Sequence, residues 1–232
     1  MKDQLLYSTT VISLIAQVLT GVIDIYALTL NYTGDKRLIK GLICVELFVQ
    51  IVEMIFYVWL VVFFTKATNV TQKRYYDWIV TTPSMLYIFI VYLDFLRNGN
   101  SVPELNEDET TWQYLVHAFM KNSNALSIIL PLNLFMLIFG YLGELHIIDK
   151  YTSVTWGFIP FVLYFYYIYE HYAKYTNPGL ILWSIFVGIW SLYGISALLP
   201  YISKNIMYNF LDIVSKNFFG VFLAVIAIMN TA

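Results

Sequence analysis

Residues 206–229 read IMYNFLDIVSKNFFGVFLAVIAIM, an apolar run long enough to cross a bilayer. A membrane-spanning helix needs about 20 predominantly apolar residues. Two ionisable side chains, Asp212 and Lys216, interrupt the run at a spacing of four, which puts them on one helical face. A charge in the middle of a membrane costs roughly 2.5–3.5 kcal/mol or more, so such residues usually serve a function. The stretch therefore predicts a transmembrane helix with a functional lysine.

The whole chain has the same apolar character. Of its 232 residues, 59% are hydrophobic and only 12% are charged, whereas soluble domains are about 25% charged. Short polar clusters separate seven apolar runs, at 8–30, 38–64, 75–96, 123–143, 153–172, 179–200 and 206–229. We therefore predict an all-α fold, an integral membrane bundle of seven transmembrane helices, with residues 1–232 as a single domain.

The connection between the third and fourth runs is the longest. Its second half places apolar residues near one helical face, which predicts a short helix at the membrane surface within 104–122. A frayed extension of the fourth transmembrane helix would give the same pattern. The apolar residues concerned are Trp112, Leu115, Phe119 and Met120.

Basic residues in the first loop give an orientation. By the positive-inside rule, Lys36, Arg37 and Lys40 favour a cytoplasmic first loop. An odd number of crossings puts the two ends of the chain on opposite sides. We therefore expect the N-terminus outside and the C-terminus in the cytoplasm.

Other functional classes find little support. The formal net charge of −2 gives no basic surface for nucleic acid. His117, His146 and His171 lie near predicted membrane boundaries without metal-ligand spacing, and the single Cys44 adds no cluster. The sequence has no nucleophile elbow or phosphate-binding loop. We expect no nucleic-acid partner, no metal site and no enzymatic activity.

The third apolar run begins with RYYDWIVTTP, residues 74–83. Arg74 and Asp77 share a helical face, so two different helices each bring a carboxylate into the membrane. Arg74 and Lys216 supply the positive charges. A salt bridge that joins helices would explain this pattern, and so would a lysine that forms a Schiff base with an aldehyde ligand.

The R-Y-x-D-W-x-x-T-T-P stretch at 74–83, together with D-x-x-x-K at 212–216, resembles the microbial (type 1) rhodopsins. The resemblance implies that Lys216 carries all-trans retinal as a protonated Schiff base. It makes Asp77 and Asp212 the counterions, with Asp77 as the proton acceptor. Arg74 would lie beneath them toward the extracellular side.

The resemblance also implies a retinal pocket built from several helices. An aromatic box suits a flat polyene, although each aromatic residue taken alone is as well explained by packing. Asn133 would hydrogen-bond to Thr82. The residues that match pocket positions are Trp78, Thr81, Thr82, Met136, Gly140, Trp156, Trp190 and Tyr193.

Two departures argue against efficient proton pumping. Outward pumps of this family usually carry a carboxylate eleven residues after the acceptor, where this chain has Ile88. The proton-releasing glutamates usual before the seventh helix are replaced by Ser-Lys-Asn at 203–205.

The second run suggests a cation path instead. Glu46, Gln50 and Glu53 follow each other at spacings of four and three, which makes one polar stripe. Two glutamates in line suit a cation path, although interhelical hydrogen bonds would use the same stripe. Glutamates of this helix line the pore of channelrhodopsins, and the pattern is similar to the group 1 viral rhodopsins of giant viruses, which include light-gated cation channels.

This resemblance implies an ion path for monovalent cations or protons, with Lys204 at its extracellular mouth. The expected function is a light-gated cation channel in a lipid membrane. An outward proton pump, or a sensory rhodopsin that signals through a partner, stays open, as does a homo-oligomer. The residues of the path would be Arg74, Glu46, Gln50, Glu53, Ser13, Lys204, Asn205 and Asn209.

Overall fold

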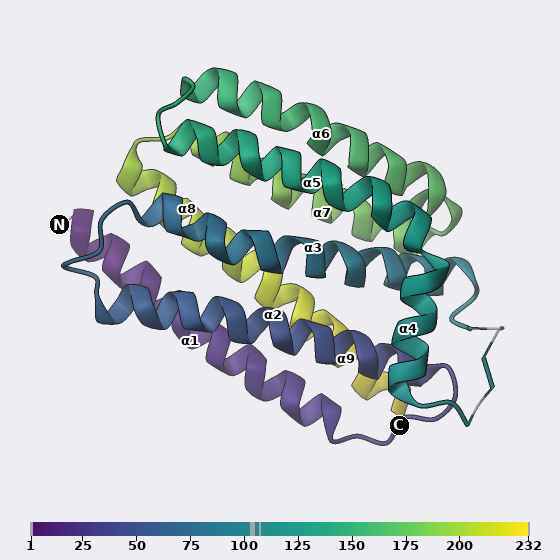
Figure 1. Ribbon diagram of the computed structural model, residues 1–232. Coiled ribbons are helices and arrows are strands. Elements are labelled where there is room, and N and C mark those ends of the chain that lie inside the picture. Colours follow the sequence, from purple (N-terminus) through teal and green to yellow (C-terminus); the bar gives the residue numbers. More distant parts are fainter. Residues whose placement is uncertain (1, 103–104, 107, 232) are drawn as a thin grey trace.

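The computed structural model describes residues 2–102, 105–106 and 108–231 and is helical throughout, with connecting turns (Figure 1). Residues 103–104 and 107, the acidic Glu104 and Glu107 among them, lie outside the described residues. The elements are α1 (Lys2–Leu28), α2 (Lys36–Val62), α3 (Val70–Arg97), α4 (Thr111–Lys121), α5 (Ser123–Glu144), α6 (Lys150–His171), η1 (Ala173–Tyr175), α7 (Asn177–Ala197), α8 (Tyr201–Asp212), η2 (Ile213–Asn217) and α9 (Phe218–Thr231).

The long helices form a seven-helix bundle, as the sequence predicts. The seventh crossing is made by α8, η2 and α9 in continuous succession. Among the described residues, six helices are long and apolar enough to span a membrane by length and composition. The exception is α6, whose apolar residues alternate with tyrosines, but it lies along α5 and α7 in the bundle (Figure 1). The two ends of the chain lie at opposite ends of the bundle (Figure 1).

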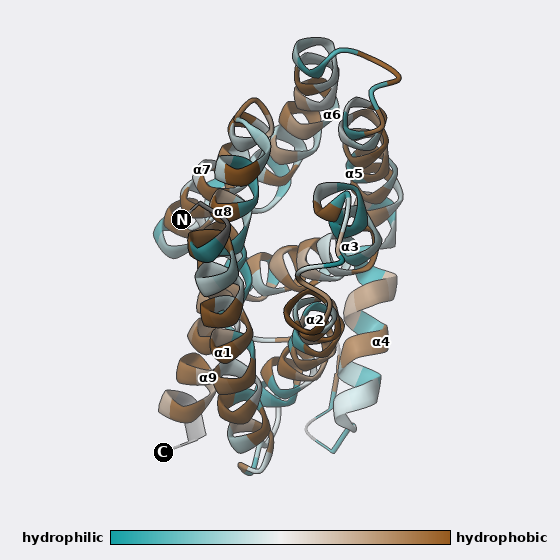
Figure 2. Ribbon diagram, turned by 90° about the vertical axis from the view of Figure 1, so that its left-hand side faces the viewer, coloured by the Kyte–Doolittle hydropathy of each residue, from teal (hydrophilic) through white to brown (hydrophobic). Residues whose placement is uncertain are grey.

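The distribution of polarity is that of a membrane protein. Large apolar side chains such as Ile55, Val62 and Ile181 face outward, and brown predominates along α1, α2 and α9 in Figure 2. The interior contains charged side chains instead, including Arg74 and Lys216. This inverted arrangement suits a lipid solvent, which favours an apolar exterior and confines charge to the bundle interior.

The helix α4 runs across the ends of the long helices rather than along them (Figure 1). It begins with a capping box, in which Thr110 and Gln113 bind each other's backbone N–H groups. Leu115 packs on Gly41 of α2, where a side chain would meet the leucine at 2.6 Å. Trp112 remains exposed. The structure therefore has a separate helix here, not an extension of α5.

Candidate functional site

Lys216 is the centre of a buried cluster of charges. Its backbone lies in η2, a five-residue π-helical segment, and its side chain is only 3% exposed. The Nζ atom lies 3.0 Å from Oε1 of Glu53, 3.1 Å from Oδ2 of Asp77 and 3.3 Å from Oδ1 of Asp212. π-Helical turns inside α-helices are frequent at functional sites, because they reorient the side chains that follow. Three helices thus bring a carboxylate to one amine.

Asp212 is held more firmly than the other two carboxylates. Its Oδ2 accepts hydrogen bonds from Nη1 of Arg74 at 3.0 Å and from the hydroxyl of Tyr57 at 2.7 Å. Its Oδ1 accepts one from the hydroxyl of Tyr193 at 2.8 Å. By contrast, one oxygen each of Glu53 and Asp77 is buried without a hydrogen-bond partner among the described residues.

The charges of this cluster do not balance if every group is ionised. Two cations, Arg74 and Lys216, face three carboxylates at hydrogen-bonding or ion-pairing distance. The sequence motif accounts for Asp77 and Asp212, whereas Glu53 was assigned to the ion path. Its contact with Lys216 makes Glu53 a member of both groups.

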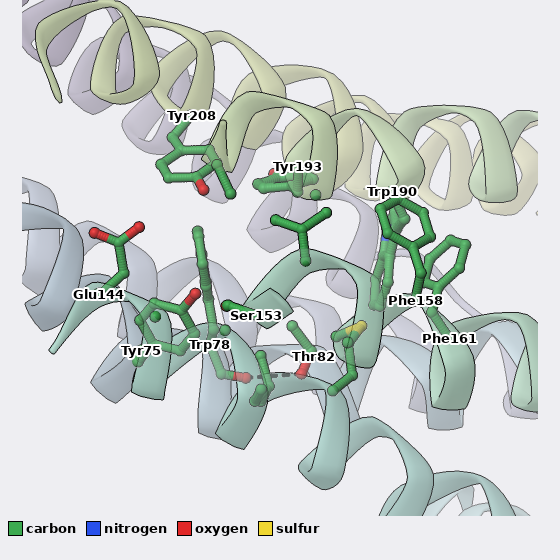
Figure 3. A pocket seen from close by; sticks show the side chains of 18 of the residues that line it. Tyr75, Trp78, Thr82, Glu144, Ser153, Phe158, Phe161, Trp190, Tyr193 and Tyr208 are labelled. Carbon is green, nitrogen blue, oxygen red and sulfur yellow. Dashed lines mark hydrogen bonds between the residues drawn. The ribbon is translucent and has the colours of Figure 1, made fainter. Parts of the chain in front are cut away.

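A cavity opens beside Lys216 between α3, α5, α6 and α7. Its empty volume is about 930 Å³, counting the open space at its mouth. In Figure 3, Tyr208, Tyr193 and Trp190 face Trp78 and Thr82 across it. Glu144 lies toward one end of the view. The walls are mostly aromatic and apolar, and the amine of Lys216 is the reactive group.

Most of the predicted pocket residues line this cavity. They are Trp78, Thr82, Met136, Gly140, Trp190, Tyr193 and Lys216.

Two predicted pocket residues do not line it. Trp156 lies on the outer face of α6, 52% exposed, where it stacks on Phe139. The neighbouring positions Ser153 and Gly157 line the cavity in its place. Thr81 is buried and donates from its hydroxyl to the carbonyl oxygen of Asp77. The predicted bond from Asn133 to Thr82 is present, at 2.8 Å.

On the N-terminal side of Lys216, polar side chains of α1, α3 and α8 meet. Arg74 is fully buried and donates to the side-chain oxygens of Asn205 and Asn209. Ser13 donates to the backbone oxygen of Asn209 at 3.0 Å, and the Asn209 amide donates to Thr10 at 3.1 Å. Four residues assigned to the ion path are therefore in one hydrogen-bonded network.

Lys204 lies apart from this network. Its Nζ atom forms a salt bridge with Oε1 of Glu144 at 2.6 Å, which joins α8 to α5 at the cavity's end. Lys204 therefore pairs with a residue of the cavity and not with the side chains of this network.

On the C-terminal side of Lys216, a second network joins α1, α2 and η2. Gln50 donates to Oε1 of Glu46 at 2.9 Å. The amide of Asn217 donates to Gln50 and to Thr20, each at 3.1 Å. Gln17 donates to Asn217 at 3.1 Å. All five side chains are buried.

The sequence analysis missed most of the α1 side of this arrangement. The signal was present, since the buried polar residues of α1 recur at spacings of three and four. Together the two networks and the charge cluster form what we call the polar column. Its members are Thr10, Ser13, Gln17, Thr20 and Asp24 of α1, Glu46, Gln50, Glu53 and Tyr57 of α2, Arg74 and Asp77 of α3, and Asn205, Asn209, Asp212, Lys216 and Asn217 of α8 and η2.

Comparison with known proteins gives the family. A family model for bacteriorhodopsin-like proteins matches residues 6–230, nearly the whole chain. No curated protein matches the chain.

Solved structures share the fold. The chain is similar to the viral rhodopsin OLPVRII, with 22% identity, a TM-score of 0.81, and 96% of this chain and 97% of the other covered. It is also similar to xanthorhodopsin, described as a light-driven ion pump with a dual chromophore, with 15% identity, a TM-score of 0.72, and 99% and 94% covered. It is also similar to Acetabularia rhodopsin I, with 14% identity, a TM-score of 0.71, and 96% of this chain and 93% of the other covered.

The cavity fits the cofactor that this family binds. Retinal is a flat polyene aldehyde, which needs an amine for attachment and a long aromatic slot. Lys216 supplies the only lysine amine at the charge cluster within the described part of the chain, and Trp78, Trp190 and Tyr193 supply the walls. Trp78 lines this cavity, and its buried Nε1 has no hydrogen-bond partner among the described residues. The chain belongs to the bacteriorhodopsin-like family, the microbial rhodopsins, which bind retinal through a Schiff base to a lysine and act as photoreceptors and ion transporters.

Proposed function

We propose that the protein is a light-gated cation channel in which Lys216 carries retinal. The observation that carries this proposal is the polar column, which follows α1 from Thr10 to Asp24. It passes directly beside Lys216, through Glu53, so the light-absorbing site and the path share a side chain. Burying a polar or ionisable side chain inside a membrane costs free energy. Such side chains therefore usually mark a path along which ions or protons move.

The carboxylates around Lys216 have different roles in this proposal. When bound, retinal supplies a light-driven isomerisation that displaces the positive charge at the Lys216 nitrogen. Asp77 has one unpartnered oxygen and one oxygen 3.1 Å from Nζ, so it is suited to accept a proton. Asp212 receives three hydrogen bonds from Arg74, Tyr57 and Tyr193, which hold it in place as a fixed counterion.

Arg74 closes the column in the dark. Its guanidinium is fully buried and fills the space among Asn205, Asn209 and Tyr57. The same guanidinium is paired with Asp212, which also lies 3.3 Å from Lys216. A charge displaced at Lys216 therefore weakens the contacts that position both Arg74 and Glu53. We infer that this coupling opens the path.

The α3 side of the bundle differs from that of the outward pumps of this family. Ile88 is fully buried in the apolar core with Phe89 and Leu86, so no carboxylate is present at the usual donor position. A column lined by carboxylates and amides is a suitable path for monovalent cations. We further propose that the first loop, with Lys36, is cytoplasmic and that the N-terminus is outside.

The experiment is a voltage-clamp recording of the Gln17→Leu variant under light. Leucine has nearly the volume of glutamine, but it removes the hydrogen bonds to Asn217 and dries the column. Because Gln17 does not contact Lys216 or line the cavity, the visible band should persist while the photocurrent falls strongly.

The matched control is Gln72→Leu, the same change at a residue that binds the backbone of Glu144 outside the column. Its photocurrent should stay near that of the unsubstituted protein. Equal currents in Gln17→Leu and Gln72→Leu would reject the column as the ion path.

A further inference from the structure

Two carboxylates at one end of the polar column, those of Asp24 and Glu46, form no salt bridge among the described residues. Asp24 is 0% exposed, and neither of its oxygens has a hydrogen-bond partner among the described residues. Glu46 is also 0% exposed, and its Oε2 has none. An isolated ionised carboxylate in an apolar interior is so costly that it takes up a proton instead. These two side chains are therefore suited to be neutral acids in the dark.

Thr20 of α1 and Glu46 of α2 meet around Gly220 of α9. A Cβ atom on Gly220 would lie 3.0 Å from Thr20 and 3.3 Å from Oε1 of Glu46. Asp24 follows Thr20 by four residues and so lies one turn further along the same face of α1. The ionisable groups that influence Glu46 electrostatically are Asp24 from α1 and Lys216 from η2. The facing part of α9 is apolar.

A polar connection leads from this pair to Lys216. Gln50 bonds to Glu46 at 2.9 Å and to Asn217 at 3.1 Å, and Asn217 directly follows Lys216. Glu53, two turns after Glu46 on α2, bonds to Nζ of Lys216. Polar side chains in such a line can hold water between them. The route from Glu46 to the lysine nitrogen thus stays within α1, α2 and η2.

Among the described residues, the α3 side of the bundle has no comparable acid. Ile88 is part of the apolar core. Asp94, further along α3, forms salt bridges with Arg97 at 2.5 Å and with Lys121 at 3.5 Å, so its carboxylate is compensated. A proton that returns to Lys216 from this half of the membrane has a polar route only past Glu46, within the described part of the chain.

We propose that Glu46 and Asp24 are the internal proton donors of the photocycle, with Glu46 giving its proton to the Lys216 nitrogen. The proposal rests on retinal being attached at Lys216. One proton first leaves the Lys216 nitrogen for an oxygen of Asp77, and Asp77 gives this proton up to water before the cycle ends. The carboxylic acid of Glu46 then loses its proton to the same nitrogen. The resulting carboxylate takes the proton of Asp24, which is restored from water at that end of the bundle.

The first test is infrared spectroscopy of the purified pigment in the dark. Glu46→Gln and Asp24→Asn should each remove a carboxylic-acid C=O band, because each variant removes one neutral acid. Asp94→Asn is the control and should remove none, since its carboxylate is paired with Arg97. Retention of all acid bands in both variants, with loss of carboxylate bands instead, would overturn the proposal and indicate a cation site.

The second test is the recovery of the visible band after a flash. General acid catalysis is worth typically 10²–10⁴-fold, so Glu46→Gln should slow recovery by about 10²-fold or more. Azide, a small diffusible weak acid, should restore the rate, which a merely structural defect would not allow. Recovery at the unsubstituted rate in both Glu46→Gln and Asp24→Asn would overturn the proposal.

The unsubstituted protein provides a readout that does not depend on variants. In a time-resolved infrared measurement, an acid band should disappear as the visible band recovers, and an acid band that stays constant through that phase would contradict the proposal. These measurements use solubilised pigment and no ion current. Failure of the channel proposal would appear only in electrical recordings.

Discussion

Among single residues, Lys216 has the most distinctive surroundings, with three carboxylates within 3.3 Å of its amine. We predict that Lys216→Ala, mixed with all-trans retinal, gives no red-shifted visible band, because only an amine can form the Schiff base. Lys204→Ala is the control and should keep the band, since Lys204 is paired with Glu144. A visible band in Lys216→Ala would show that attachment occurs elsewhere.

Asp77 and Glu53 compete for the role of principal counterion. With Arg74 paired to Asp212, one further ionised carboxylate balances Lys216. We predict that Asp77→Asn shifts the visible band to longer wavelength, because loss of a counterion spreads the positive charge over the polyene. Glu53→Gln should shift it much less. Absorption spectra of the two isosteric variants make the comparison, and a larger shift in Glu53→Gln would exchange the two roles.

The sequence predicted some of these contacts and not others, for a physical reason. The shared face of Asp212 and Lys216, and that of Arg74 and Asp77, each follow from spacing within a single helix. The contact of Glu53 with Lys216 depends on how α2 packs on η2, which periodicity does not specify. Asp24 was missed because only Ser13 of the α1 stripe was considered. Trp156 was assigned by the resemblance alone, and the rotation of α6 turns it outward.

Among the helices, the predicted spans agree with the structure to within a few residues at most ends. The apolar run at 38–64, for example, corresponds to α2 at Lys36–Val62. Ends differ more where polar residues continue the helix, as in α3, which begins at Val70 rather than 75. Hydropathy detects the part of a helix that lies in the membrane, whereas backbone hydrogen bonding continues beyond it. The π-helical turn of η2 has no sequence signal of this kind.

The start of α6 provides a test of helix capping. Asp149 accepts hydrogen bonds from the backbone N–H groups of Tyr151 and Thr152, each at 3.0 Å. Its hydrogen bonds with Thr152 hold the pKa of Asp149 below its usual range. The cap therefore stabilises the fold above the ordinary aspartate pKa of about 4, and this stabilisation is lost as pH falls through the lower pKa of the folded state.

We accordingly predict that Asp149→Ala lowers the Tm at neutral pH and has a smaller effect in strong acid. Asp149→Asn keeps an acceptor oxygen and should lose less. Thermal unfolding of the two variants across this pH range is the measurement. A difference from the unsubstituted protein that does not change with pH would contradict the role of the ionised cap.

In the whole molecule, the polar column runs between α1, α2 and the helix formed by α8, η2 and α9. The retinal cavity lies between α3, α5, α6 and α7. Lys216 is between the two. The sequence predicted seven crossings because polar clusters separate seven apolar runs. It could not predict that the path and the cavity share one lysine, because that follows from the packing of helices far apart in the chain.

Direction of transport separates a channel from a pump most directly. A pump moves protons one way across ordinary voltages, whereas the current of a channel reverses where the ion gradient balances the voltage. Moving one charge through 100 mV is worth about 2.3 kcal/mol, so modest voltages suffice. Voltage-clamp recording under light should give a current whose reversal potential follows the Na⁺ or K⁺ gradient. Outward current at every voltage, unaffected by those gradients, would contradict the account and indicate a proton pump.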